Sequence, residues 1–95
     1  MKATYKQMES LLEKRECFEG NSVEAVKEDG LYVIKSFGTV VAYFDEKWVV
    51  NEYKYSATTS KITNLIKRIA GEFELRSIEF FNEKFNQEWH GKRER

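Results

Sequence analysis

The sequence predicts a small α+β domain built from an N-terminal helix, an antiparallel meander of three or four strands, a second helix and a C-terminal helix. Apolar residues recur at helical spacing at both ends of the chain. Between them lie short alternating runs rich in β-branched and aromatic residues. The gaps between these runs are short enough to force neighbouring strands to run antiparallel. The 95 residues are expected to form a single domain, 1–95.

The first expected element is an amphipathic helix over residues 3–18. Its apolar face consists of Tyr5, Met8, Leu11, Leu12 and Phe18. Thr4 is expected to cap the start, because its hydroxyl can accept a backbone N–H of the first turn. Gly20 is the expected stop, since glycine tolerates the left-handed conformation that ends many helices.

Four runs are expected to be strands, with turns at residues 28–30, at Gly38 and at residues 45–47. The runs are 22–27, 31–37, 39–44 and 47–53. The face toward the helices is expected to carry Val33, Val40, Ala42, Phe44, Trp48 and Val50. Lys35 and Glu52 fit the opposite face or the strand ends. A bulge near Gly38 would reverse this alternation.

The region from Thr58 to Ala70 has the clearest helical pattern. Its apolar face consists of Ile62, Leu65, Ile66, Ile69 and Phe73. Thr58 or Thr59 is the expected N-cap and Gly71 the expected stop. The final segment, 73–89, again approximates helical spacing, although Phe73 and Leu75 also fit a short strand. Residues 91–95 have no apolar side chain and are expected to form a flexible tail.

Composition gives no sign of catalysis, metal or cofactor. Sixteen basic and sixteen acidic residues cancel, so there is no global field toward nucleic acid or membrane. Cys17 and His90 are the single cysteine and histidine, too few for a disulfide or a zinc site. No nucleophile lies beside a predictable base, and the glycines match no phosphate-binding motif. We therefore expect a non-enzymatic protein with no cofactor, located in the cytoplasm.

The junction between the last predicted strand and the second helix is the first candidate binding surface. It carries Tyr53, Lys54, Tyr55, Thr58, Thr59, Ser60 and Lys61. The hydroxyls and ammonium groups are suited to a phosphate, and the tyrosines to stacking on a base. The order helix, three strands, helix is also that of the double-stranded-RNA-binding domain. Helix capping and packing at the sheet edge are the structural alternative. Lys61 most needs a functional reason, because a cation in the first helical turn opposes the helix dipole.

The C-terminal segment is the second candidate surface. Residues 72–89 hold five glutamates against two basic residues, a net charge of −3. Three of them, Glu79, Glu83 and Glu88, are candidate contacts for a basic protein surface. In the structural alternative, the aromatic residues of this segment complete the core.

Several spaced blocks of the sequence form a pattern: Gly20-Asn21-Ser22, the run from Tyr32 to Ala42, Trp48, Asn51 and the run from Tyr55 to Lys61. These blocks resemble a group of small proteins of unknown function encoded by bacteriophages and related mobile elements. The resemblance covers about residues 15–70 and leaves out the segment after Gly71. This chain has Ile62 where the group's pattern has histidine, and Phe37 where tyrosine is common.

The resemblance implies a phage-derived accessory protein. Phage genes of this size often encode proteins that block a host machine, including inhibitors of CRISPR nucleases. A host or phage protein is therefore the expected partner of a monomer or small homo-oligomer. The alternative is a small nucleic-acid-binding domain that uses residues 53–61.

Overall fold

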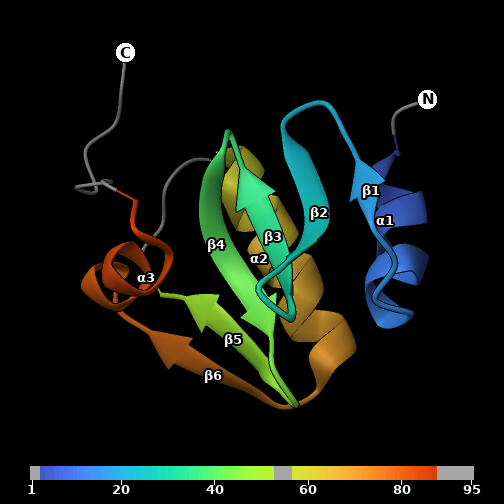
Figure 1. Cartoon of the computed structure of the whole chain (residues 1–95). Helices are drawn as coiled ribbons and strands as arrows, with labels where there is room; N and C mark the ends of the chain where they lie inside the picture. Colours follow the sequence, from blue (N-terminus) through green and yellow to red (C-terminus); the bar gives the residue numbers. More distant parts are fainter. Residues whose placement is uncertain (1–2, 53–56, 88–95) are drawn as a thin grey trace.

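A six-stranded mixed sheet forms the centre of the computed structural model, which describes residues 3–52 and 57–87. Helices α1 and α2 cover one face of the sheet and α3 lies on the other (Figure 1). The elements in chain order are α1 (Tyr5–Glu13), β1 (Phe18–Glu19), β2 (Val23–Glu28), β3 (Leu31–Ser36), β4 (Thr39–Phe44), β5 (Trp48–Asn51), α2 (Ala57–Ala70), β6 (Phe73–Arg76) and α3 (Ile78–Phe85).

The four predicted strands correspond to β2 to β5 and are consecutive antiparallel neighbours, and β1 adds a fifth antiparallel strand that was not predicted. Strands β1 to β5 pair with their neighbours in sequence order, and all four pairings are antiparallel. The predicted run 39–44 coincides with β4, and the other three runs agree with β2, β3 and β5 to within two residues. Thr4 caps α1 as expected: its hydroxyl accepts from Gln7 N, and Thr4 N donates to Gln7 Oε1. The α+β class predicted from periodicity is therefore correct.

The first helix is shorter than expected. It ends at Glu13, and Arg15 takes a φ of 54° as the chain reverses. Positions three and four residues after Leu12 are charged, so a longer helix would have no apolar side chain to bury. Phe18 therefore begins β1 instead of extending α1. Gly20 ends no helix and lies buried between β1 and β2.

The C-terminal segment adds a sixth strand, so the sheet has six strands instead of three or four and is not wholly antiparallel. Its first residues form β6, which pairs in parallel with β5. Gly71, with a φ of +72°, ends α2 as predicted and lets the chain turn back toward the sheet. A parallel neighbour needs a long crossover, and α2 provides it. Ser77 then caps α3, its hydroxyl accepting from Phe80 N at 3.1 Å.

The register of β3 against β4, which includes a bulge in β4, corrects the predicted faces. Ile34 pairs with Ala42 but Lys35 pairs with Val40, so Val41 is the extra residue. Val41 and Ala42 consequently both pack in the cluster under α1 and α2. Of the six residues predicted for that face, Val33 and Val40 instead pack on the opposite face. They join Tyr43, Val49 and Phe81 of α3 there, so this second face is also partly apolar.

In the described part of the chain, no helix combines the length and the apolar character needed to cross a membrane.

Candidate interaction surface

Three segments meet at one end of the sheet. They are the connection between β1 and β2 (residues 20–22), the connection between β3 and β4 (37–38) and the first turn of α2 (57–60) (Figure 1). We call these three segments the turn end. They correspond to three of the sequence blocks described above, although the blocks are far apart in the chain.

One backbone hydrogen bond joins the two strand connections, and another closes the first of them. Phe37 N donates to Ser22 O at 2.7 Å between the connections, and Gly20 N donates to Val23 O at 2.6 Å within the β1–β2 connection. A Cβ on Gly20 would lie 2.5 Å from Met8 Cε and 3.0 Å from Val23 O. Glycine at this position lets the turn pack against α1. Hydrogen bonds and packing against α1 therefore fix the backbone of the two strand connections.

The first turn of α2 is attached to the same end through a buried pair of hydroxyls. Ser36 Oγ and Thr59 Oγ1 are 2.7 Å apart, and both residues are buried. This contact joins the end of β3 to the helix start. Thr59 therefore contributes to the interior of the turn end rather than to its surface.

Phe37 is the most exposed large apolar residue among the described residues, with 66% of its surface accessible. It has a φ of 54°, and Gly38, which follows it, has a φ of +81°. Strand pairing resumes at Ser36 and Thr39, so Phe37 and Gly38 form a two-residue hairpin turn. Turns with two positive φ values normally begin with asparagine, aspartate or glycine. The hairpin between β2 and β3 follows that rule with Asp29 and Gly30, whose φ values are 52° and 80°.

A hollow of about 220 Å³ lies beside Phe37. The described residues that line it are Glu19, Gly20, Asn21, Ser22, Val23, Glu24, Phe37 and Gly38. Among them are two carboxylates and no lysine or arginine. The surface around the exposed ring therefore combines polar groups with negative charge.

The residues predicted for the strand–helix junction are distributed differently. Tyr53, Lys54 and Tyr55 lie outside the described residues. Helix α2 begins at Ala57, so Thr58 and Thr59 are in its first turn and neither is its N-cap. Ser60 is half-buried, and its carbonyl accepts from the Thr63 hydroxyl at 3.2 Å.

The described positive charges of α2 do not gather into one patch. Lys61 is exposed, and its Nζ lies 5.3 Å from the centroid of the Tyr5 ring. Lys67 Nζ lies 5.8 Å from the Phe73 ring, and Arg68 reaches Glu9 at 3.6 Å. Each charge has a separate neighbour. The cation–π contact with Tyr5 gives Lys61 a structural role that the sequence did not suggest.

The predicted acidic surface is partly present. Glu79 and Glu83 are exposed on α3, and Glu88 lies outside the described residues. Glu79 is in the first turn of α3, where a carboxylate complements the helix dipole. Phe81 is fully buried, and Phe80 and Phe85 pack around it. The aromatic residues of α3 therefore complete the core, as the structural alternative predicted.

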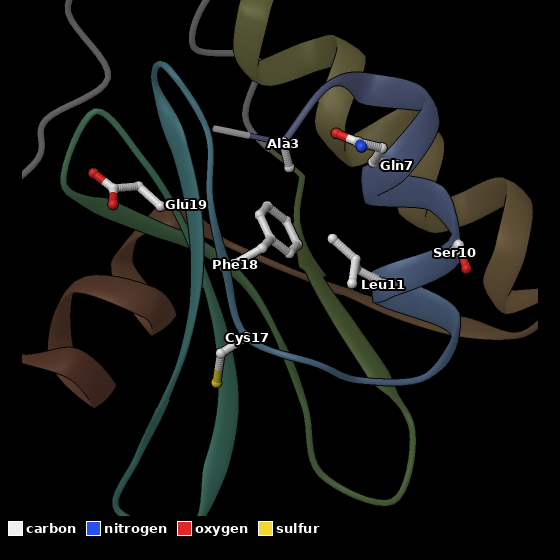
Figure 2. A pocket seen from close by; sticks show the side chains of 7 residues that line it. All are labelled: Ala3, Gln7, Ser10, Leu11, Cys17, Phe18 and Glu19. Carbon is white, nitrogen blue, oxygen red and sulfur yellow. The ribbon is translucent and has the colours of Figure 1, made fainter. Parts of the chain in front are cut away.

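A second hollow, of about 460 Å³, lies between α1 and β1. Figure 2 shows Leu11 and Phe18 side by side within it, while the Cys17 sulfur points away from them. The other lining residues are Ala3, Gln7, Ser10 and Glu19. Cys17 is a free, exposed cysteine. The lining has no histidine or lysine beside the thiol, so it lacks the basic partner that activates a nucleophile.

Among residues 3–52 and 57–87, no three histidine, cysteine or acidic side chains lie close enough to hold a metal ion. In the same ranges, every buried side-chain nitrogen or oxygen has a hydrogen-bond partner. No buried polar group in the described residues therefore points to a ligand.

Residues 6–83 match a protein family described as a family of unknown function (DUF8033). The chain belongs to the DUF8033 family. Comparisons with curated proteins and with solved structures give no match. The family span includes β6 and most of α3, which the resemblance over residues 15–70 left out. It also contains Ile62, which is fully buried under the sheet, so the position where the phage group has histidine faces the core here.

Sequence reasoning did not select Phe37 as a site residue in this DUF8033 protein. The available signal was an aromatic residue directly before glycine in a two-residue gap between strands. A hairpin gap of that length favours asparagine or aspartate, as at Asp29. An aromatic residue in such a gap therefore indicates an exposed side chain at a position that disfavours it.

Proposed function

We propose that this protein is a non-catalytic binding module that docks a protein partner through its turn end, with Phe37 as the central contact. The observation that carries the proposal is Phe37 itself, an aromatic ring two-thirds exposed on a backbone with positive φ.

Two unfavourable features coincide at Phe37. A residue with a Cβ costs roughly 1–2 kcal/mol in the left-handed region. Leaving a phenylalanine side chain in water forgoes about 1.5–3 kcal/mol that burial would contribute. A bound partner that covers the ring would gain the free energy of burying the phenylalanine side chain. Strained, exposed positions of this kind cluster at functional sites.

The charge near Phe37 favours a protein partner over nucleic acid. Glu19 and Glu24 line the adjoining hollow, and phosphate groups would be repelled there. A partner segment with polar or basic side chains meets no such repulsion. The exposed Glu79 and Glu83 of α3 are a second surface for a basic partner.

The nucleic-acid alternative rests on one observation, the exposed Lys61 beside the Tyr5 ring near the start of α2. A cation and an aromatic ring on one surface suit a phosphate and a base. The neighbouring hydroxyl of Thr59 is engaged by Ser36, which leaves this site with fewer donors than the sequence suggested.

We place the protein in the bacterial cytoplasm as a phage-derived accessory protein, with a host protein such as a CRISPR nuclease as one candidate partner class. The support for this is the resemblance of the sequence blocks, together with the single cysteine.

The test uses the Phe37→Asn variant, which keeps a residue suited to positive φ and removes the ring. The wild-type chain is immobilised, and proteins captured from a bacterial extract are identified and then titrated as purified proteins. Affinity for a genuine partner should fall by about tenfold or more in Phe37→Asn, as for an interface hot spot. The matched control is Asp29→Asn, which also creates an Asn-Gly turn but in the other hairpin, and it should leave affinity unchanged.

The nucleic-acid alternative is tested by a separate titration. Duplex RNA, duplex DNA and single strands are titrated at two salt concentrations against the wild-type chain and a Lys54→Glu, Lys61→Glu double variant. Salt-sensitive binding that the double variant abolishes and Phe37→Asn preserves would favour nucleic acid and overturn the protein-binding proposal.

A further inference from the structure

The two edges of the sheet differ in how they are covered. At the β1 edge, Ala3 N donates to Glu19 O at 2.8 Å, so the chain preceding α1 covers that strand. At the other edge, β6 pairs with β5 on one side, and no strand in the described residues pairs with its outer side (Figure 1). An open strand edge with apolar side chains is a template for pairing with another chain.

The outward-facing backbone groups of β6 follow from its register. Arg76 lies opposite Asn51, and Glu52 N donates to Arg76 O at 2.9 Å. Because backbone groups alternate in direction along a strand, Glu74 and Arg76 direct theirs toward β5. Phe73 and Leu75 therefore direct their N–H and C=O groups toward the open edge.

The side chains of β6 divide in the same alternating way. Phe73 and Leu75 lie on the face of α1 and α2, and they are 38% and 45% exposed. Glu74 and Arg76 lie on the other face and form an ion pair with each other. Glu74 also binds Lys47 at 2.9 Å, using its other carboxylate oxygen. The strand thus presents one acid and one base, each adjacent in sequence to Leu75.

We infer that two copies of this chain associate through β6, in an antiparallel pairing centred on Leu75. A two-fold axis at this position places Leu75 opposite its counterpart, and the two residues exchange N–H···O=C bonds in both directions. Glu74 of each copy then lies opposite Arg76 of the other, which gives two cross-strand pairs of opposite charge. The apolar side chains of the two strands meet on the other face.

Neighbouring registers are less favourable for physical reasons. Centring the pair on Glu74 or on Arg76 would place like charges directly opposite each other. Charged side chains on a strand edge normally discourage pairing with other strands. In the Leu75-centred register, however, Glu74 and Arg76 attract their counterparts in a second copy of the chain.

Reversing the charge of Glu74 or of Arg76 tests the inference. Sedimentation equilibrium over a concentration series should show the 11.3 kDa chain approaching twice its mass as concentration rises. Glu74→Arg alone and Arg76→Glu alone should each weaken self-association by about tenfold or more, because both cross-strand pairs become repulsive.

Mixing these two variants distinguishes strand pairing from other causes. In a mixed dimer, the Glu74→Arg strand carries two basic side chains and the Arg76→Glu strand carries two acidic ones. Both cross-strand pairs are then again of opposite charge, so the mixture should associate as the wild type does. The double variant carrying both substitutions should also associate with itself. Failure of the mixture and the double variant to associate would overturn the inference, as would a wild-type chain that remains monomeric at every concentration.

Leu75→Pro provides a backbone test. Proline removes only the outward N–H and is tolerated on an edge strand whose N–H faces solvent. This variant should stay folded and monomeric. Leu75→Ile, which retains the N–H and the apolar volume, should associate like the wild type. Equal association of the proline variant and the wild type would exclude β6 pairing.

Discussion

At the scale of single residues, replacing Phe37 should affect stability and partner binding in opposite directions. Asparagine tolerates the left-handed conformation better than phenylalanine does, so Phe37→Asn should raise the free energy of unfolding by about 1 kcal/mol. Urea denaturation measures this change. Asp29→Asn, at the equivalent position of the other hairpin, should change stability by no more than about 0.5 kcal/mol. A destabilised Phe37→Asn variant would show that the ring serves the fold instead of a partner.

The buried Tyr32 makes the stability of the fold depend on pH in the alkaline range. Its hydroxyl donates to Glu16 O at 2.6 Å, and its ring packs edge-on against Trp48. Burial raises the pKa of Tyr32 above its ordinary value of 10.0, and the charges of Cys17 and Glu16 raise that pKa further. The folded state therefore retains the proton more strongly than the unfolded state. The resulting stability is complete below pH 10 and is lost as the pH rises above it.

Tyr32→Phe tests this linkage. At neutral pH the variant should lose about 0.5–1.5 kcal/mol of unfolding free energy with the hydrogen bond. The difference between wild type and variant should then shrink as the pH rises above about 10, because the wild type alone loses the Tyr32 contribution. Denaturation at several pH values measures both effects. A difference that stays constant with pH would contradict this role.

At the scale of secondary-structure elements, the segment after α3 covers a part of β4 that has no strand beside it. Strand β5 pairs with Ala42, Tyr43 and Phe44, so Val40 lies beyond its end. The Gln87 side chain takes the place of a strand there. Its Oε1 accepts from Val40 N at 2.9 Å, and its Nε2 donates to Val40 O at 3.2 Å. This clamp holds the segment after α3 against the sheet.

Gln87→Ala should therefore loosen that segment. Loss of two hydrogen bonds predicts a decrease of about 1–3 kcal/mol in unfolding free energy. It also predicts faster exchange of the Val40 amide hydrogen. Glu83→Ala, an exposed position on α3, should change neither quantity appreciably. If Val40 exchanged at the same rate in both variants, the clamp would have no energetic role.

At the scale of the whole molecule, the turn end and the β6 edge lie at different places on the sheet (Figure 1). They share no residues, so their effects should be additive. Leu75→Pro should abolish self-association and retain partner binding, and Phe37→Asn should do the reverse. Analytical sedimentation and partner titration of both variants and of their combination check this. Loss of both properties in either single variant would show that the two surfaces form one site.

The candidate site was only partly accessible from the sequence. The blocks at residues 20–22, 32–42 and 55–61 directed attention to the relevant segments. Their meeting at one end of the sheet depends on long-range contacts such as Ser36 with Thr59 and Phe37 with Ser22. Sequence spacing contains no information about such contacts, so it selected Thr59 for the surface when that side chain is buried.

The sequence by itself determined most of the local elements: the strands β2 to β5, the buried face of α2 and the caps at Thr4 and Gly71. These follow from alternation, helical periodicity and turn chemistry, which act over a few neighbouring residues. Only the tertiary structure decided that residues 73–76 pair with β5 and that Val33 and Val40 lie on the α3 face, Val33 opposite Tyr43 and Val40 beyond the bulge at Val41. Both outcomes depend on the strand that lies alongside, and a partner distant in sequence leaves no periodic signal.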